Sequence, residues 1–276
     1  MKQPPREAPY ALGHSERELR RLSMQARIYE PFTLRMLQRA GVSHGMRVLD
    51  VGSGPGDVAL LCASLAGPQG EVIGIDRAPE AIEMARQRVQ AAGVENVTFL
   101  LGDPMEMAPE GRFDAVVGRL VLMHQPDPAA MLRKLAQSLS PGGIIAFQEL
   151  DIGGARSVPP SPAFEQCLQW IEAAFAVVGG DNRMGMKLYP TFRAACLPGP
   201  SMSIEGGIWG GPDNPAAVMV SEVMLTLLPL LVKSGIATEE QVGIHSLRDR
   251  IEKEIVDSGG VATSPSLISA WTRVPQ

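Results

Sequence analysis

Short apolar runs alternate with helical patterns through the middle of the chain. Five runs rich in valine and isoleucine, each bounded by polar or turn residues, fall at 47–51, 72–76, 97–103, 113–122 and 144–149. One intervening segment places Ile82, Ala85 and Val89 on a single helical face. Continuous apolar strands separated by helices are typical of a parallel sheet covered on both faces. The pattern predicts an open, doubly wound α/β domain over about 44–150, which would bind its ligand beyond the carboxyl ends of the strands.

The flanking segments are helical in pattern. Residues 1–14 contain three prolines, which predict a mobile arm rather than a helix. One helix is expected from Ser15, and a second is expected to restart at Pro31 and to stop at Gly41. Beyond residue 151, helices are expected at 161–178, 186–196, 213–233 and 238–257, and strands at 201–209 and 266–273.

Composition and charge exclude several classes of protein. Of 276 residues, 45% are hydrophobic and 20% are charged, which is typical of a globular protein. The net charge of −5 and the lack of a concentrated basic face argue against a nucleic acid partner. The three widely spaced cysteines form no C-x-x-C pair, so no metal site is predicted. The longest apolar stretch has ten residues against the ~20 of a membrane span, and we expect a cytoplasmic protein without a membrane partner.

The first apolar strand runs directly into a glycine turn, Gly52-Ser53-Gly54-Pro55-Gly56. Such a turn lets a ligand approach the backbone closely. Asp50 precedes the turn and Asp57 begins the following helix, where a dinucleotide pyrophosphate would be repelled and a cationic ligand would be favoured. The alternative interpretation is structural, with Asp57 as a plain helix cap and Asp50 as a strand-end residue that binds loop amides.

Two further acids fall at strand ends. Asp76 ends the second strand 24 residues after Gly52, close to the ~20-residue offset at which an acid binds ribose hydroxyls. Asp103 ends the third strand, where a carboxylate can accept a hydrogen bond from an adenine amino group. Three consecutive strands that each end in aspartate indicate a nucleoside-containing, cationic ligand.

Four stretches carry a resemblance to the class I S-adenosylmethionine-dependent methyltransferases of the ubiquinone/menaquinone-biosynthesis type. VLDVGSGPGD resembles the first motif of that family, VIGID its second-strand acid, LGDPMEM its adenine-contacting loop, and FDAVVGRLVLMHQPDPAAMLRKLAQSLSPGGIIAFQE its fourth strand, helix and fifth strand. The resemblance covers about 44–150. It implies a Rossmann-like seven-stranded sheet whose last strand is antiparallel, with a helical N-terminal arm and a helical lid insertion.

The resemblance also implies a set of cofactor-binding residues. The turn glycines would face the methionine part of S-adenosylmethionine, Asp76 would bind the ribose, and Asp103 with Met105 would bind the adenine. Arg119, at a position that varies in the family, would line the methionine pocket. The full set of candidates is Gly52, Gly54, Gly56, Asp50, Asp76, Arg77, Asp103, Pro104, Met105 and Arg119.

The acceptor is expected to be a small molecule, methylated on carbon, oxygen or nitrogen and aromatic or natural-product-like in character. After the fourth strand the chain reads Gly118-Arg119-Leu120-Val121, without the Pro-Pro-aromatic motif of nucleic-acid amino methylases. Methyl transfer is an in-line displacement, and a base is needed only where the acceptor must lose a proton. The candidate catalytic residues are His124, Tyr10 and Glu149, with positioning alone as the alternative.

These inferences predict three parts: an N-terminal arm and helices that form a lid (1–43), an S-adenosylmethionine-binding core (44–150), and acceptor-binding lid helices with the last two strands (151–276). We expect a monomer or a homodimer. Two other functions stay open. The chain could bind S-adenosylmethionine and catalyse a reaction without methyl transfer. A nicotinamide-dependent oxidoreductase is a further alternative, which Asp57 disfavours.

Overall fold

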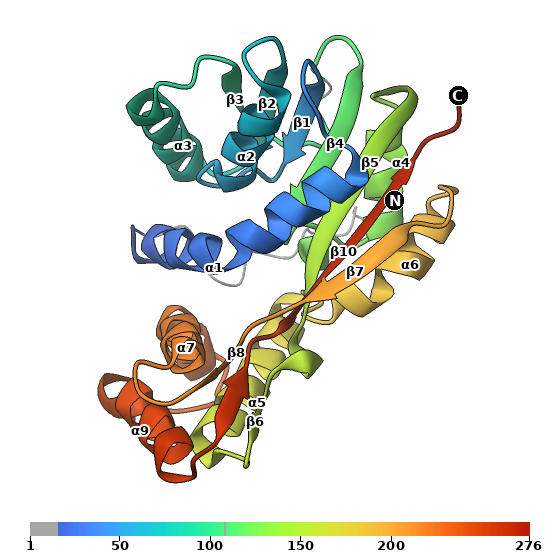
Figure 1. The fold of residues 1–276 in the computed structure, drawn as a ribbon. Helices are drawn as coiled ribbons and strands as arrows, with labels where there is room; N and C mark the ends of the chain where they lie inside the picture. Colours follow the sequence, from blue (N-terminus) through green and yellow to red (C-terminus); the bar gives the residue numbers. More distant parts are fainter. Residues whose placement is uncertain (1–15, 108) are drawn as a thin grey trace.

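A seven-stranded sheet forms the centre of the protein (Figure 1), in a computed structural model that describes residues 16–107 and 109–276, with side chains from residue 28 onward. The strand order is β3-β2-β1-β4-β5-β10-β7. The strands are β1 (Arg47–Val51), β2 (Glu71–Asp76), β3 (Val97–Leu101), β4 (Phe113–Arg119), β5 (Leu139–Asp151), β7 (Ser201–Glu205) and β10 (Ser266–Arg273).

The first five strands of the sheet are parallel, and β10 runs antiparallel between β5 and β7. This confirms the predicted Rossmann-like sheet with an antiparallel last strand. The register pairs Val51 with Gly118 and Arg119 with Gln148, so β1 and β4 end nearly level with one another, and β5 continues past them to Asp151. Strand ends that lie level bring the residues that follow them to one edge, where doubly wound sheets bind ligands.

Helices cover both faces of the sheet. One face packs against α1 (Glu16–Ala40), α2 (Asp57–Ala66) and α3 (Pro79–Ala92), through a buried cluster that includes Leu37, Cys62 and Val117. The other face packs against α4 (Pro128–Ala136) and α6 (Met184–Ala194) through a larger cluster. Two short 3-10 turns, η1 (Leu122–His124) and η2 (Ile152–Gly154), follow β4 and β5.

A second group of elements lies beside the main sheet, at the bottom of Figure 1. It contains α5 (Pro162–Val178), α7 (Pro215–Lys233), α8 (Glu239–Val242) and α9 (Ile244–Asp257), with a three-stranded sheet in the order β6 (Arg156–Val158), β9 (Val261–Thr263), β8 (Ile208–Gly210). We refer to this group as the helical insertion. Its central helix α7 packs on α5, α9 and α1, so it connects the insertion to the N-terminal helix.

The structure corrects several predicted boundaries. α1 is one helix that contains Pro31, because a proline removes one hydrogen bond and need not end a helix whose following turns bury Met36, Leu37 and Ala40 against the sheet. The predicted 238–257 helix divides at Gly243, which has φ +56°. The predicted strand 201–209 is two strands, β7 and β8, that belong to different sheets, and the small sheet itself was not predicted.

α7 is also the one described helix that is long and apolar enough to cross a membrane, with a mean hydropathy of 1.9 and 39% of that window buried. One such helix is weak evidence for a membrane span, because a core helix passes the same test. All three cysteines are free, and the described residues contain no group of three or more His, Cys, Asp or Glu side chains that could hold a metal ion. The cytoplasmic location stays a prediction.

Candidate cofactor and acceptor site

The glycine turn between β1 and α2 forms the floor of the candidate site. Gly52, Gly54 and Gly56 all have positive φ, at 64°, 50° and 86°. A Cβ at Gly52 would lie 2.6 Å from the Val121 side chain, and one at Gly56 would lie 2.9 Å from Phe99, so neither position has room for a side chain. A Cβ at Gly54 would meet nothing within 4 Å. The turn therefore needs glycine for its conformation, and at Gly54 the backbone is open to a ligand.

Asp76 fixes this turn against the end of β2. Its Oδ2 accepts a 2.8 Å hydrogen bond from the Gly54 N–H, and its Oδ1 accepts a 2.9 Å bond from the Ala78 N–H. The side chain is partly exposed and each oxygen has a further lone pair. Asp76 can therefore hold the turn and still accept from a hydroxyl, and its predicted role at the ribose stays a prediction.

The loop after β3 contains Asp103, Pro104 and Met105 and lies beside Arg77, so four predicted cofactor-binding residues are close together. Asp103 Oδ1 accepts a 2.7 Å hydrogen bond from the Met105 N–H, and Arg77 Nη1 lies 3.8 Å from Asp103 Oδ2. Pro104 is buried between them, and Lys134 of α4 donates to the Met105 carbonyl. These contacts hold the loop at both ends. Asp103 and Met105 are partly exposed and could contact the adenine ring of the cofactor.

Asp50 is the least satisfied polar group of the site. It is 1% exposed, and neither carboxylate oxygen has a hydrogen-bond partner among the described residues. Burial raises the pKa of Asp50 to about 8, with Asp76 and Asp57 adding to the rise and Arg119 opposing it. The neighbouring Ser53 hydroxyl is also buried without a partner. Unpaired buried acceptors are costly, and a cationic group that binds there would satisfy them.

Arg119 extends from the end of β4 between α1 and α2. Its Nη1 donates a 3.1 Å hydrogen bond to Thr33 Oγ1, and its Nη2 lies 3.7 Å from Asp57 Oδ2. The other oxygen of Asp57 lies 2.7 Å from Arg88 Nη2. Burial lowers the pKa of Arg119, and the charges of Asp57 and Asp50 oppose that effect.

These contacts revise the argument made from Asp57. Two arginines offset its charge, so it would repel a pyrophosphate less strongly than its position in the sequence suggests. Nor is Asp57 a plain cap, because Gly56 occupies the N-cap position of α2 and no side chain caps that helix.

Glu149, predicted as a catalytic residue, is buried inside the protein. Its Oε1 accepts hydrogen bonds from the N–H groups of Val121 (2.9 Å) and Leu122 (2.7 Å), and its Oε2 accepts one from Met123 at 3.3 Å. Burial raises the pKa of Glu149 to about 7 in spite of these bonds, which oppose the rise. The side chain is 0% exposed, so its role as a base is disfavoured; the carboxylate instead holds the η1 turn.

His124 ends that same η1 turn and reaches the helical insertion. Its partly exposed ring stacks on Phe175 of α5, with centroids 6.2 Å apart and an interplanar angle of 29°. The adjacent Met123 carbonyl accepts a 2.8 Å bond from the Asp181 N–H just beyond α5. His124 therefore lies between the carboxyl edge of the sheet and the insertion. Tyr10, the third predicted catalytic residue, lies outside the described residues.

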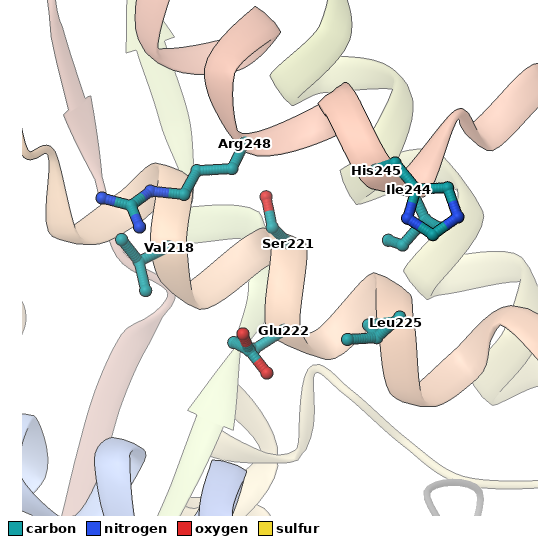
Figure 2. A pocket seen from close by; sticks show the side chains of 7 residues that line it. All are labelled: Val218, Ser221, Glu222, Leu225, Ile244, His245 and Arg248. Atoms are coloured by element: carbon teal, nitrogen blue, oxygen red, sulfur yellow. The ribbon is translucent and has the colours of Figure 1, made fainter. Parts of the chain in front are cut away.

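A pocket of about 230 Å³ lies within the helical insertion, between α7 and α9 (Figure 2). Ser221 points from α7 toward α9, Glu222 points away from α9, and Arg248 and His245 belong to α9. Val218, Leu225 and Ile244 supply apolar walls. None of these residues was predicted as a site residue.

Sequence reasoning also missed a chain of buried polar side chains beside Arg119. Thr33 Oγ1 lies 2.7 Å from Gln148 Oε1, and Gln148 Nε2 donates a 2.8 Å bond to Ser269 Oγ. Thr33, Gln148 and Ser269 are at most 1% exposed. The available signal was Gln148, a polar residue inside the otherwise apolar run Ile144–Phe147, because buried amides require partners.

Fold and site together define a class I S-adenosylmethionine-dependent methyltransferase: a seven-stranded sheet with an antiparallel last strand, a glycine turn after β1, and acids at or just beyond the ends of three strands. The chain belongs to the methyltransferase domain family, which matches residues 42–193. The resemblance seen in the sequence is thereby confirmed, and S-adenosylmethionine is the cofactor of this class.

Curated relatives match the core of the chain. Demethylmenaquinone methyltransferase of Geobacillus kaustophilus is 34% identical over 115 residues, 41% of this chain and 49% of the relative. The corresponding enzyme of Staphylococcus aureus is 34% identical over 133 residues, 48% of this chain and 52% of the relative. The match thus spans about half the length of these relatives.

Two solved structures share the fold over most of the chain. The YcgJ protein of Bacillus subtilis matches with a TM-score of 0.54 at 18% identity, covering 89% of this chain and 99% of that one. A proposed methyltransferase of Bacillus halodurans matches with a TM-score of 0.56 at 17% identity, covering 88% and 99%. At this identity the likeness concerns the fold alone.

Proposed function

We propose that this protein transfers the methyl group of S-adenosylmethionine to a small, largely apolar organic acceptor. The observation that carries the proposal is the placement of a carboxyl and a guanidinium on neighbouring strands, Asp50 on β1 and Arg119 at the end of β4. The methionine end of the cofactor carries an ammonium and a carboxylate, which match these two groups. Asp50 also has two buried oxygens without partners, which fit a cation.

The remaining cofactor-side residues fit the nucleoside. Asp76 stands at the glycine turn with a free lone pair on each oxygen for the ribose hydroxyls, and Asp103 with Met105 forms the edge of an adenine site. The bound cofactor supplies an electrophilic methyl group on sulfur. The chain's own contribution is to hold the two reactants in line and to exclude water, and these effects can supply most of the rate in a displacement of this kind.

The acceptor would lie between η1 and the helical insertion. His124 faces Phe175 there, and α7 contributes partly buried apolar side chains, including Met219 and Val223. An apolar, adaptable wall suits an aromatic or isoprenoid-like molecule. The similarity to enzymes named for demethylmenaquinone points to a quinol-like acceptor, whose ring carbon or hydroxyl would receive the methyl group.

Binding and transfer can be tested separately. Calorimetry should show tight binding of S-adenosylhomocysteine and no binding of NADH; the reverse result would overturn the proposal. Radiolabelled S-adenosylmethionine should then label at least one member of a panel of reduced naphthoquinones and phenols with apolar tails. Tight S-adenosylhomocysteine binding without labelling of any acceptor, and with turnover of an unmethylated substrate, would instead indicate a non-methylating enzyme.

A further inference from the structure

Thr33 occupies an unusual position for a helical threonine. Its hydroxyl lies 3.1 Å from the Tyr29 carbonyl one turn earlier in α1, the contact that threonine commonly makes in helices. It also accepts a hydrogen bond from Arg119 and contacts Gln148 of β5 at 2.7 Å. One hydroxyl therefore joins the N-terminal helix to the ends of two strands of the sheet. The side chain is 0% exposed, so water does not compete for these bonds.

The Arg119 guanidinium contacts both the Thr33 hydroxyl and Asp57. Two acids of the site attract this guanidinium: Asp50 acts on it at longer range, and Asp57 Oδ2 is 3.7 Å from its Nη2, beyond hydrogen-bond reach. In a buried environment such an attraction is strong, and a free guanidinium would move onto Asp57 to form a direct, charge-assisted bond. The Thr33 hydroxyl accepts a hydrogen bond from Nη1, the other terminal nitrogen of the guanidinium.

We propose that Thr33 is a positioning residue for the methionine end of the cofactor, and that it acts by holding the Arg119 guanidinium where it can bind the cofactor carboxylate. The inference rests on the proposed function, in which Arg119 binds that carboxylate. Thr33 donates a hydrogen bond to Gln148 Oε1 on β5, which leaves its oxygen to accept from Arg119, whereas Ser269 of β10 binds the other end of the Gln148 amide. Loss of the Thr33 hydroxyl would let Arg119 pair with Asp57, and the carboxylate of the cofactor would then lose its partner.

The test compares two ligands that differ only at the methionine end. S-adenosylhomocysteine carries the amino and carboxylate groups, whereas 5′-methylthioadenosine keeps the adenosine and the thioether but lacks both. The nearly isosteric Thr33→Val variant should weaken S-adenosylhomocysteine binding about tenfold, the size of one lost hydrogen bond to a charged group. It should leave the dissociation constant of 5′-methylthioadenosine within about twofold. Thr33→Ser, which keeps the hydroxyl, should bind both ligands about as tightly as the original protein does. A purely structural threonine would change both affinities together.

Ser269→Ala provides a matched control. Ser269 is as deeply buried as Thr33 and belongs to the same chain of hydrogen bonds, but it lies at the far end from Arg119. This variant should lower the melting temperature, because it leaves a buried amide without its partner. It should leave the ratio of the two dissociation constants unchanged. If it shifts that ratio as much as Thr33→Val does, the network is only structural and the proposal is wrong.

Arg119→Gln separates this inference from the function on which it rests. If Arg119→Gln weakens S-adenosylhomocysteine binding but Thr33→Val does not, then Thr33 has no positioning role and the proposed function stands. If Arg119→Gln leaves the ratio of the two affinities at its original value, then the placement of the carboxylate itself is wrong. Should Thr33→Val fail to fold, Thr33→Ala removes the same hydroxyl and serves the same comparison.

Discussion

The carboxylate of Glu149 accepts a 2.7 Å hydrogen bond from the backbone N–H of Leu122, the first residue of the turn that ends at His124. Glu149, which the sequence predicted as a catalytic residue, thus supports the turn that carries His124, another candidate catalytic residue. Glu149→Gln would replace one accepting oxygen with an N–H₂ group that faces backbone donors. We expect a loss of about 1–3 kcal/mol in the free energy of unfolding, measured by urea denaturation at pH 7.5. Unchanged stability would show that the carboxylate is not needed by the turn.

Asp50 should make the stability of the ligand-free protein depend on pH. Its pKa is raised to about 8, so the folded state binds a proton that the unfolded chain releases near pH 4. The contribution of Asp50 to the stability of the folded state is therefore fully present below about pH 4 and is lost as the pH rises to 8. Asp50→Asn removes this loss, so the variant should melt at a higher temperature than the original protein at pH 8.

The comparison variant is Asp249→Asn, which changes an exposed acid on α9. The melting temperature of this variant should differ from that of the original protein by the same amount at every pH. If Asp50→Asn does the same, then Asp50 titrates in the folded protein much as it does in the unfolded chain.

The Asp50 carboxyl should also link cofactor binding to proton release. A cation that binds beside Asp50 favours its ionised form, so the carboxyl must lose its proton on binding at pH 7. Calorimetric titrations with S-adenosylhomocysteine in phosphate and in Tris, whose ionisation enthalpies differ, should report the release of up to one proton per site. The affinity should rise with pH up to about 8. Asp50→Asn should bind more weakly and release no proton from this position, and equal heats in both buffers for the original protein would contradict the prediction.

The sequence predicted the core of this protein better than its periphery, for physical reasons. Each of the five parallel strands is a continuous apolar run, which can be recognised from a few neighbouring positions. The glycine turn can be recognised in the same way, because Gly52 and Gly56 have no room for a side chain and must be glycine. The small sheet depends on strands of three residues from 156–158, 208–210 and 261–263, which are too short to show periodicity. Thr33 and Gln148 are 115 positions apart, and only the folded chain brings them together.

Pro31 and Glu149 show how a correct local rule can mislead. Proline does favour the first turn of a helix, but burial of α1 against the sheet outweighs the loss of one hydrogen bond. Glu149 does end the fifth apolar run, at the edge where ligands bind. Its side chain alternates to the opposite face from Gln148, however, and there it meets three backbone N–H groups.

The N-terminal segment and the helical insertion are expected to close over the bound ligands. α1 contacts α7 of the helical insertion, and His124, beyond the end of β4, stacks on Phe175 of the same insertion. Hydrogen exchange with and without S-adenosylhomocysteine should show added protection in 1–30 and in 213–257. Strand β7, at the opposite edge of the sheet from β3, provides the reference. Protection confined to 44–150 would refute the closure.

The last prediction concerns the general base that would remove a proton from the acceptor. If the acceptor loses a proton, His124 is the preferred group, because a neutral imidazole titrates near the working pH and Glu149 is committed to the η1 turn. His124→Ala should then lower the single-turnover rate of methyl transfer about 10²–10⁴-fold, while the dissociation constant of S-adenosylhomocysteine stays nearly constant. His124→Gln keeps much of the contact with Phe175 without the acid–base function, so it separates proton transfer from packing. Tyr10→Phe tests the remaining candidate in the same assay. If all three variants retain near-native rates, proximity and orientation carry the catalysis, as expected for an acceptor that is already nucleophilic.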